Sequence, residues 1–145
     1  METTIKNILL VDDSPNDIKL IKSALRKANF ANEIFVAEDG EEALDFLYNR
    51  GKFAGYTGGT PIFILLDINL PLMNGIEVLK EIRADIAFTR IPVIMLTSSR
   101  DTQDLRECYD NGANSFVVKP VIIADFLQVV KDLGHYWVVI NEKPV

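Results

Sequence analysis

Short runs of apolar residues alternate along the chain with longer stretches in which apolar residues recur every three or four positions. The short runs are typical of strands buried in a parallel sheet, and the spacing of the longer stretches is typical of amphipathic helices. The pattern predicts strands over 5–11, 33–37, 62–66, 91–96 and 115–118. It predicts helices over 15–28, between Gly40 and Arg50, from Gly75, over 101–111 and from near Ile122.

This alternation of five strands with five helices determines the expected fold class. A strand that returns parallel to its predecessor needs a crossover connection, usually a helix, and such crossovers are right-handed. We therefore expect residues 1–145 to form a single doubly wound α/β domain, with helices on both faces of a five-stranded parallel sheet.

Two segments do not follow the repeating pattern. Residues 51–61 are rich in glycine and end at a proline, which predicts a long loop. This loop is either a tolerated surface insertion or a partner-contact loop anchored by Phe53 and Tyr56. The C-terminal tail, residues 134–145, is apolar; it either packs on its own domain or forms a homodimer seam with the fifth helix.

Composition and charge exclude several classes of protein. Apolar residues make up 48% of the 145 residues, which is too many for a disordered chain, and no apolar run is long enough for a membrane helix. The formal net charge of −6 argues against direct DNA binding. A single cysteine, Cys108, and an N-terminus unlike a signal peptide favour a cytoplasmic protein.

Polar side chains stand where four of the five predicted strands end. Asp12 and Asp13 follow the first strand, Asp67 the third, Thr97 the fourth and Lys119 the fifth. Because the carboxyl ends of parallel strands lie along one edge of the sheet, we expect these side chains to converge. Each residue alone also suits a helix cap or a solvated surface position, but all of them at one edge indicate a site.

Three carboxylates at one place repel one another unless a cation lies between them. Two like charges about 4 Å apart cost roughly 4 kcal/mol at an effective dielectric constant near 20. The available donors are oxygen atoms, so the expected cation is Mg²⁺, or Mn²⁺ in its place. Since Mg²⁺ completes its shell with water and phosphate oxygens, Asp67 becomes a candidate nucleophile for a phosphoryl group, with Thr97 and Lys119 stabilising its oxygens.

In order and spacing these residues resemble the receiver domains of response regulators, the CheY-like phosphoacceptors of two-component signalling. The resemblance covers about residues 5 to 133 and implies a flavodoxin-like (βα)5 fold with strand order 2-1-3-4-5. The segments that carry it are Val11-Asp12-Asp13-Ser14, the ten residues from Leu66 to Gly75, Leu96-Thr97-Ser98 and Val118-Lys119-Pro120.

The resemblance implies a role for each acidic residue of the cluster. Asp67 occupies the position that is phosphorylated in receivers. Mg²⁺ would be held by Asp13, by Asp67 and by the backbone carbonyl of Asn69, with Asp12 acting mainly through water.

The resemblance also implies a switch. Thr97 matches the hydroxyl that moves towards the phosphoryl group, and Phe116 matches the aromatic side chain whose rotamer follows that movement. Lys119 matches the lysine that pairs with the phosphoryl oxygens, and its bond to Pro120 matches a cis peptide bond of the family.

A receiver of this kind is expected to be no enzyme beyond self-phosphorylation and slow autodephosphorylation. We expect a stand-alone regulator that accepts its phosphoryl group from a sensor histidine kinase or a histidine phosphotransfer protein. It would then signal to a downstream protein target through altered contacts. The segment from Asp12 to Asp17, the long loop and the tail further resemble single-domain regulators partnered with cyanobacterial phytochrome kinases.

Three other functions share parts of this pattern. A phosphatase of the haloacid-dehalogenase type also forms an aspartyl phosphate, but it needs an aspartate where Asn69 stands. A flavodoxin-like nucleotide binder needs Ser, Thr and Gly donors where Asp12 and Asp13 would repel phosphate. A degenerate receiver would lack one of the chemical positions, and each of them is filled in this sequence.

Overall fold

The computed structural model describes residues 7–98 and 102–132, which contain a five-stranded parallel sheet of order β2-β1-β3-β4-β5. The strands are β1 (Ile8–Val11), β2 (Ile34–Ala37), β3 (Phe63–Asp67), β4 (Val93–Thr97) and β5 (Ser115–Val118). The helices are α1 (Pro15–Lys27), α2 (Gly40–Tyr48), α3 (Gly75–Ala84), α4 (Thr102–Asp110) and α5 (Ile123–Asp132). The predicted fold class and strand order are confirmed.

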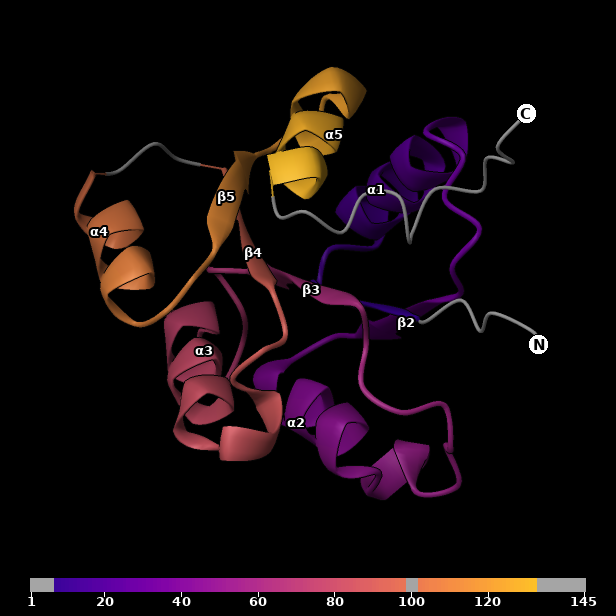
Figure 1. Ribbon diagram of the computed structural model, residues 1–145, viewed down its shortest axis with the longest axis vertical. Helices are drawn as coiled ribbons and strands as arrows, with labels where there is room; N and C mark the ends of the chain where they lie inside the picture. Colours follow the sequence, from indigo (N-terminus) through magenta and orange to yellow (C-terminus); the bar gives the residue numbers. More distant parts are fainter. Residues whose placement is uncertain (1–6, 99–101, 133–145) are drawn as a thin grey trace.

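Helices cover both faces of the sheet, with α1 and α5 on one face and α2, α3 and α4 on the other (Figure 1). Alternate residues of each central strand enter different cores: Ile8 packs on the side of α1 and α5, and Leu9 on the opposite side. Both faces of β1 and β3 are therefore buried, which explains why these strands read as continuous apolar runs in the sequence.

Capping residues define the starts of α1, shortly after β1, and of α3, shortly after β3. The Ser14 hydroxyl accepts a hydrogen bond from the Asp17 backbone N–H at 3.2 Å, and Pro15 occupies the first turn of α1. At α3, Asn74 and Glu77 form a complete capping box. These local signals fix where the helices start and leave the residues at the strand ends facing the edge of the sheet.

The predicted loop over 51–61 begins with a short 3₁₀ helix, η1 (Gly51–Phe53), and folds onto the domain. The Phe46 ring lies 5.0 Å from that of Phe53 and 4.8 Å from that of Tyr56, between ring centroids. The Tyr56 ring also lies 5.0 Å from that of Phe35. The half-buried rings of Phe53 and Tyr56 thus pack the loop against its own domain. The two residues proposed as anchors for a partner therefore make contacts within the chain.

Other expectations concern boundaries and segments at the ends. A second 3₁₀ helix, η2 (Ile86–Phe88), was not predicted. β3 starts one residue later than expected, β4 starts two residues later and ends one residue later, and β1 starts at Ile8, although a strand was expected from residue 5. The tail, residues 134–145, lies outside the described residues, so the homodimer seam stays a prediction. Within 7–98 and 102–132, none of the helices combines the length and apolar character needed to cross a membrane.

Candidate functional site

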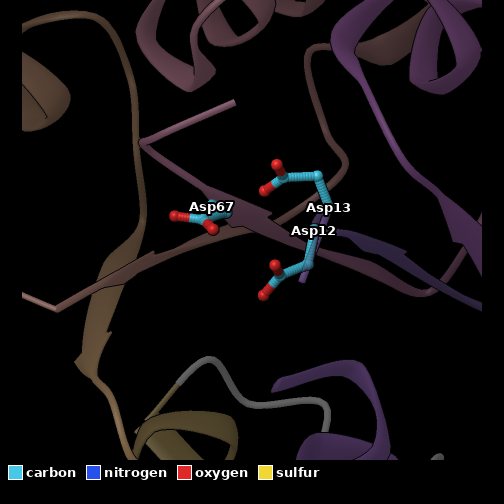
Figure 2. A group of neighbouring side chains, drawn as sticks. All are labelled: Asp12, Asp13 and Asp67. Carbon is cyan, nitrogen blue, oxygen red and sulfur yellow. The ribbon is translucent and has the colours of Figure 1, made fainter. Parts of the chain in front are cut away.

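Three aspartates meet at the edge where β1 and β3 end. β1 pairs with β3 so that Val11 lies beside Leu66, and the next residues along each strand are Asp12 and Asp67. One carboxylate oxygen from each of Asp12, Asp13 and Asp67 lies within 4.8 Å of the others (Figure 2). The convergence expected from parallel strand ends is therefore present in the folded chain.

The three carboxylates differ in their exposure to solvent. Asp12 is 0% exposed and Asp67 is 5% exposed, whereas Asp13 lies on the surface. The cluster thus has a buried floor and an open side. An all-oxygen donor set with three acids and one open side suits a hard divalent cation that keeps some of its water ligands. The residues present therefore fit the predicted metal.

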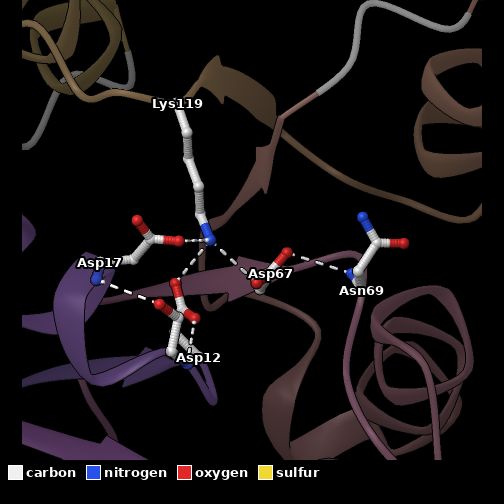
Figure 3. A network of polar contacts seen from close by, with 6 residues as sticks. Asp12, Asp17, Asp67, Asn69 and Lys119 are labelled. Carbon is white, nitrogen blue, oxygen red and sulfur yellow. Dashed lines mark hydrogen bonds and ion pairs between the residues drawn. The ribbon is translucent and has the colours of Figure 1, made fainter.

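Lys119 reaches the cluster from the end of β5 and places its ammonium group among carboxylates (Figure 3). Its Nζ atom lies 2.8 Å from Oδ2 of Asp12 and 2.9 Å from Oδ2 of Asp67. A third carboxylate also contacts it, since Oδ2 of Asp17 lies 3.0 Å away. The lysine therefore partly balances the negative charge of the cluster.

These contacts change the pKa values of the buried groups. Burial alone would lower the pKa of Lys119, but its hydrogen bonds with Asp12, Asp67 and Asp17 outweigh that effect and raise it. Burial raises the pKa of Asp67, and hydrogen bonds from Lys119 and the Asn69 backbone offset this rise only in part. The ammonium group consequently stays charged beside the carboxylates.

Backbone groups orient the two buried carboxylates. Oδ1 of Asp12 accepts a hydrogen bond from the Ser14 backbone N–H at 3.0 Å. Oδ1 of Asp67 accepts one from the Asn69 backbone N–H at 3.1 Å. In both residues Oδ1 thus faces the backbone, and Oδ2 faces Lys119. The role of the Asn69 carbonyl as a metal ligand stays a prediction.

The predicted switch residues lie on the two strands beside the cluster. Thr97 is the buried last residue of β4, and its carbonyl accepts a hydrogen bond from the Lys119 backbone N–H at 2.7 Å. Phe116 of β5 is half-buried, and its ring centroid lies 6.2 Å from that of Tyr109 in an edge-on arrangement. The Lys119–Pro120 peptide bond is cis, as the resemblance implies. The switching role of Thr97 and Phe116 stays a prediction.

Asp17 is a residue of the site that sequence reasoning missed. Its spacing from Ser14 suggests a capping box, but the Ser14 backbone N–H donates to Asp12, and the Asp17 carboxylate contacts Lys119. The two partners lie 102 positions apart in the sequence, so no local pattern could have paired them. The available signal was an acidic side chain in the first turn of α1, the helix that begins close to the same sheet edge.

Comparison with known proteins gives a consistent result. The sequence pattern of the response regulator receiver domain family matches residues 8–131. Response regulator Rcp1 of Synechocystis is 34% identical over 132 residues, covering 91% of this chain and 88% of that protein.

Two solved structures support the same relationship. The bacteriophytochrome response regulator AtBRR has a TM-score of 0.88 and 46% identity, covering 97% of this chain and 100% of that one. The Mn²⁺-bound form of Rcp1 has a TM-score of 0.75 and 33% identity, covering 97% of this chain and 99% of that one. The fold, the acidic cluster with its lysine and these similarities lead to one conclusion: the chain belongs to the response regulator receiver domain family.

Proposed function

We propose that this protein is a response regulator that accepts a phosphoryl group on Asp67 with the help of Mg²⁺, for which Mn²⁺ can substitute. The observation that supports this most strongly is the position of Asp67, whose carboxylate shares one small volume with Asp12, Asp13 and the ammonium group of Lys119. The structure of the relative Rcp1 in a Mn²⁺-bound form supports a divalent cation in this chain as well.

The proposed reaction is a phosphoryl transfer from a phosphohistidine of a partner protein. A carboxylate oxygen of Asp67 attacks the phosphorus atom, the phosphorus–nitrogen bond breaks, and the electron pair leaves with the imidazole, which takes up a proton. A bound divalent cation would neutralise charge on the transferring oxygens. Lys119 pairs with a phosphoryl oxygen, while the Ser14 and Asn69 backbone N–H groups keep Asp12 and Asp67 oriented.

The signal is proposed to leave by a shift between two packings of the domain. The Thr97 hydroxyl donates a hydrogen bond to a phosphoryl oxygen, and the half-buried Phe116 ring moves into the space that the Thr97 side chain leaves. The surface of β5 then presents different contacts to a downstream protein target. In this proposal the domain's own chemistry is limited to phosphorylation and slow dephosphorylation of Asp67, with no external substrate to turn over.

The phosphodonor is proposed to be a phytochrome-type sensor histidine kinase or a histidine phosphotransfer protein. This partner class is supported by the similarity to the bacteriophytochrome response regulator AtBRR along nearly the whole chain. The phosphatase alternative is disfavoured because the exposed amide of Asn69 cannot donate a proton as the second aspartate of such enzymes does.

Intact mass measured after incubation with acetyl phosphate and Mg²⁺ tests the proposal. We expect one added phosphoryl group in the wild type and none in Asp67→Ala. Asp125→Ala serves as the matched control, because Asp125 is an exposed aspartate on α5 outside the cluster, and it should be labelled like the wild type. Unchanged mass in the wild type, or labelling of Asp67→Ala, would contradict the proposal.

A further inference from the structure

Lys119 contacts a carboxylate that does not belong to the metal cluster. The cluster consists of Asp12, Asp13 and Asp67, whereas Asp17 lies in the first turn of α1 and its carboxylate contacts Lys119. Figure 3 shows the ammonium group between Asp17 on one side and Asp67 on the other. The lysine thus has one anionic partner whose charge is not needed to bind the cation.

The other two partners of Lys119, Asp12 and Asp67, also belong to the proposed cation site. Oδ2 of Asp12 and Oδ2 of Asp67 lie 2.8 Å and 2.9 Å from Nζ, and both residues belong to the acidic cluster that fits a divalent cation. An ammonium group and a divalent cation repel each other, and they compete for the same carboxylates. Cation binding therefore weakens the hold of Asp12 and Asp67 on the lysine.

Asp17 can keep the ion pair between its carboxylate and Lys119 when a cation binds to the cluster. Its backbone N–H donates to the Ser14 hydroxyl, which fixes the first turn of α1, and its side chain is about one-third exposed (35%), so its charge is not costly to keep. The Lys119 side chain is 12% exposed and would be costly to leave without an anionic partner.

We propose that Asp17 is a positioning residue that holds the Lys119 ammonium group while a divalent cation binds in the cluster of Asp12, Asp13 and Asp67. By doing so it strengthens cation binding without contacting the cation. The inference rests on the proposed function in that it assumes the same cation site, but it concerns metal affinity and not phosphoryl transfer.

Mg²⁺ affinity measured by titration calorimetry on the unphosphorylated protein tests the inference. We expect Asp17→Asn to weaken Mg²⁺ binding about two- to fivefold, the range of a partly exposed ion pair. Glu81→Gln makes the same change in net charge at an exposed position on α3 and should bind Mg²⁺ like the wild type. Asp17→Glu, which keeps the charge on a longer stem, should restore most of the affinity.

A double-mutant cycle separates action through the lysine from a direct effect of charge on the cation. In a Lys119→Met background, Asp17→Asn should no longer change Mg²⁺ affinity. If the same loss persists without the lysine, or if Asp17→Asn alone binds like Glu81→Gln, the inference is overturned. If wild-type protein takes up a phosphoryl group but Asp17→Asn leaves Mg²⁺ affinity unchanged, this inference fails and the proposed function stands.

Discussion

Among the residues that the structure describes, the buried charged side chains are Asp12 and Asp67, both in the acidic cluster. A buried carboxylate costs several kcal/mol unless it is paired and hydrogen-bonded. Lys119 and the backbone N–H groups of Ser14 and Asn69 supply that pairing. Buried carboxylates that need an ion pair and backbone hydrogen bonds are typical of functional sites.

Leu72, in the loop between β3 and α3, is held in an unfavourable backbone conformation. It adopts a left-handed backbone conformation with φ of 67° although it is not glycine, and its side chain is 88% exposed. We expect Leu72→Asn to raise the free energy of unfolding by about 0.5–1 kcal/mol, because asparagine tolerates this conformation. Urea denaturation measures the change, and Leu20→Asn on the exposed face of α1 should instead destabilise slightly. Equal effects of the two substitutions would contradict the explanation.

The buried thiol of Cys108 makes the free energy of unfolding depend on pH. Burial, aided by Asp104 and Glu107, raises the pKa of the Cys108 thiol from its ordinary value of 9.0 to about 11. Between these values the unfolded chain loses the proton and the folded chain keeps it, so stability falls as the pH rises. We expect the wild type to lose about 1–2 kcal/mol more than Cys108→Ala between pH 8.5 and 10.5, measured by urea denaturation. Parallel pH profiles would show that the thiol is not perturbed.

The site residues were predictable from sequence to different degrees. Asp12, Asp13, Asp67, Thr97 and Lys119 each follow an apolar run, and the parallel topology brings such positions to one edge. Asp17 could not be assigned in the same way, because its partner is fixed by the crossing of α1 over the sheet and not by local spacing. An acidic residue in the first turn of a helix is common without any further partner, so no sequence feature gave a reason to pair Asp17 with Lys119.

At the scale of elements, the start of α3 determines how closely the helix approaches the cluster. Gly75 is the first residue of α3, and its backbone N–H donates to the Ile68 carbonyl at 2.8 Å. A Cβ atom at this position would overlap the Asp67 carbonyl oxygen and come within 2.8 Å of the Ile68 Cα atom. Only glycine allows the helix to begin directly against the backbone that carries Asp67.

We therefore expect Gly75→Ala to destabilise the fold by about 2 kcal/mol or more, because the clash is with backbone that cannot rotate away. Gly55→Ala is the matched control, since a Cβ there meets nothing within 4 Å, and its effect should lie within about 0.5 kcal/mol. Thermal unfolding of the two variants measures the difference. Similar melting temperatures would argue against a tight approach of α3 to Asp67.

The sequence predicted the long elements and missed the short ones. Continuous apolar runs identified the strands, and the expected start of the third helix at Gly75 agrees with the first residue of α3. The helices η1 and η2 are each three residues long, too short for a periodic pattern to emerge. The position of Tyr56 against Phe35 and Phe46 was also beyond sequence reasoning, because ring packing depends on the path of the loop.

At the scale of the whole molecule, periodicity alone does not fix strand order. Five parallel strands with right-handed crossovers can be wound in more than one order, and the order β2-β1-β3-β4-β5 was implied by the family resemblance. This order puts β1 and β3 side by side at the centre of the sheet, and the reversal of winding direction between them creates the edge where ligands bind. The acidic cluster lies at that reversal.

A cation that binds only the folded chain must stabilise the whole molecule. At a Mg²⁺ concentration of about 100 times the dissociation constant, we expect the free energy of unfolding to rise by about 2.7 kcal/mol, and a chelator should reverse the gain. Asp13→Asn should remove most of it, whereas Asp125→Asn, outside the cluster, should keep it. Chemical denaturation with and without Mg²⁺ measures this. Equal Mg²⁺ stabilisation of both variants would place the cation elsewhere.

The most direct test of the central claim is to locate the covalent bond. Protein treated with acetyl phosphate and Mg²⁺ is reduced with borohydride, which converts an aspartyl phosphate into homoserine, and the modified position is read by peptide mass spectrometry. We predict homoserine at position 67, dependent on both the phosphodonor and Mg²⁺. Homoserine at position 12 or 13 instead, or an unmodified Asp67 in a chain that has taken up phosphate, would contradict the account.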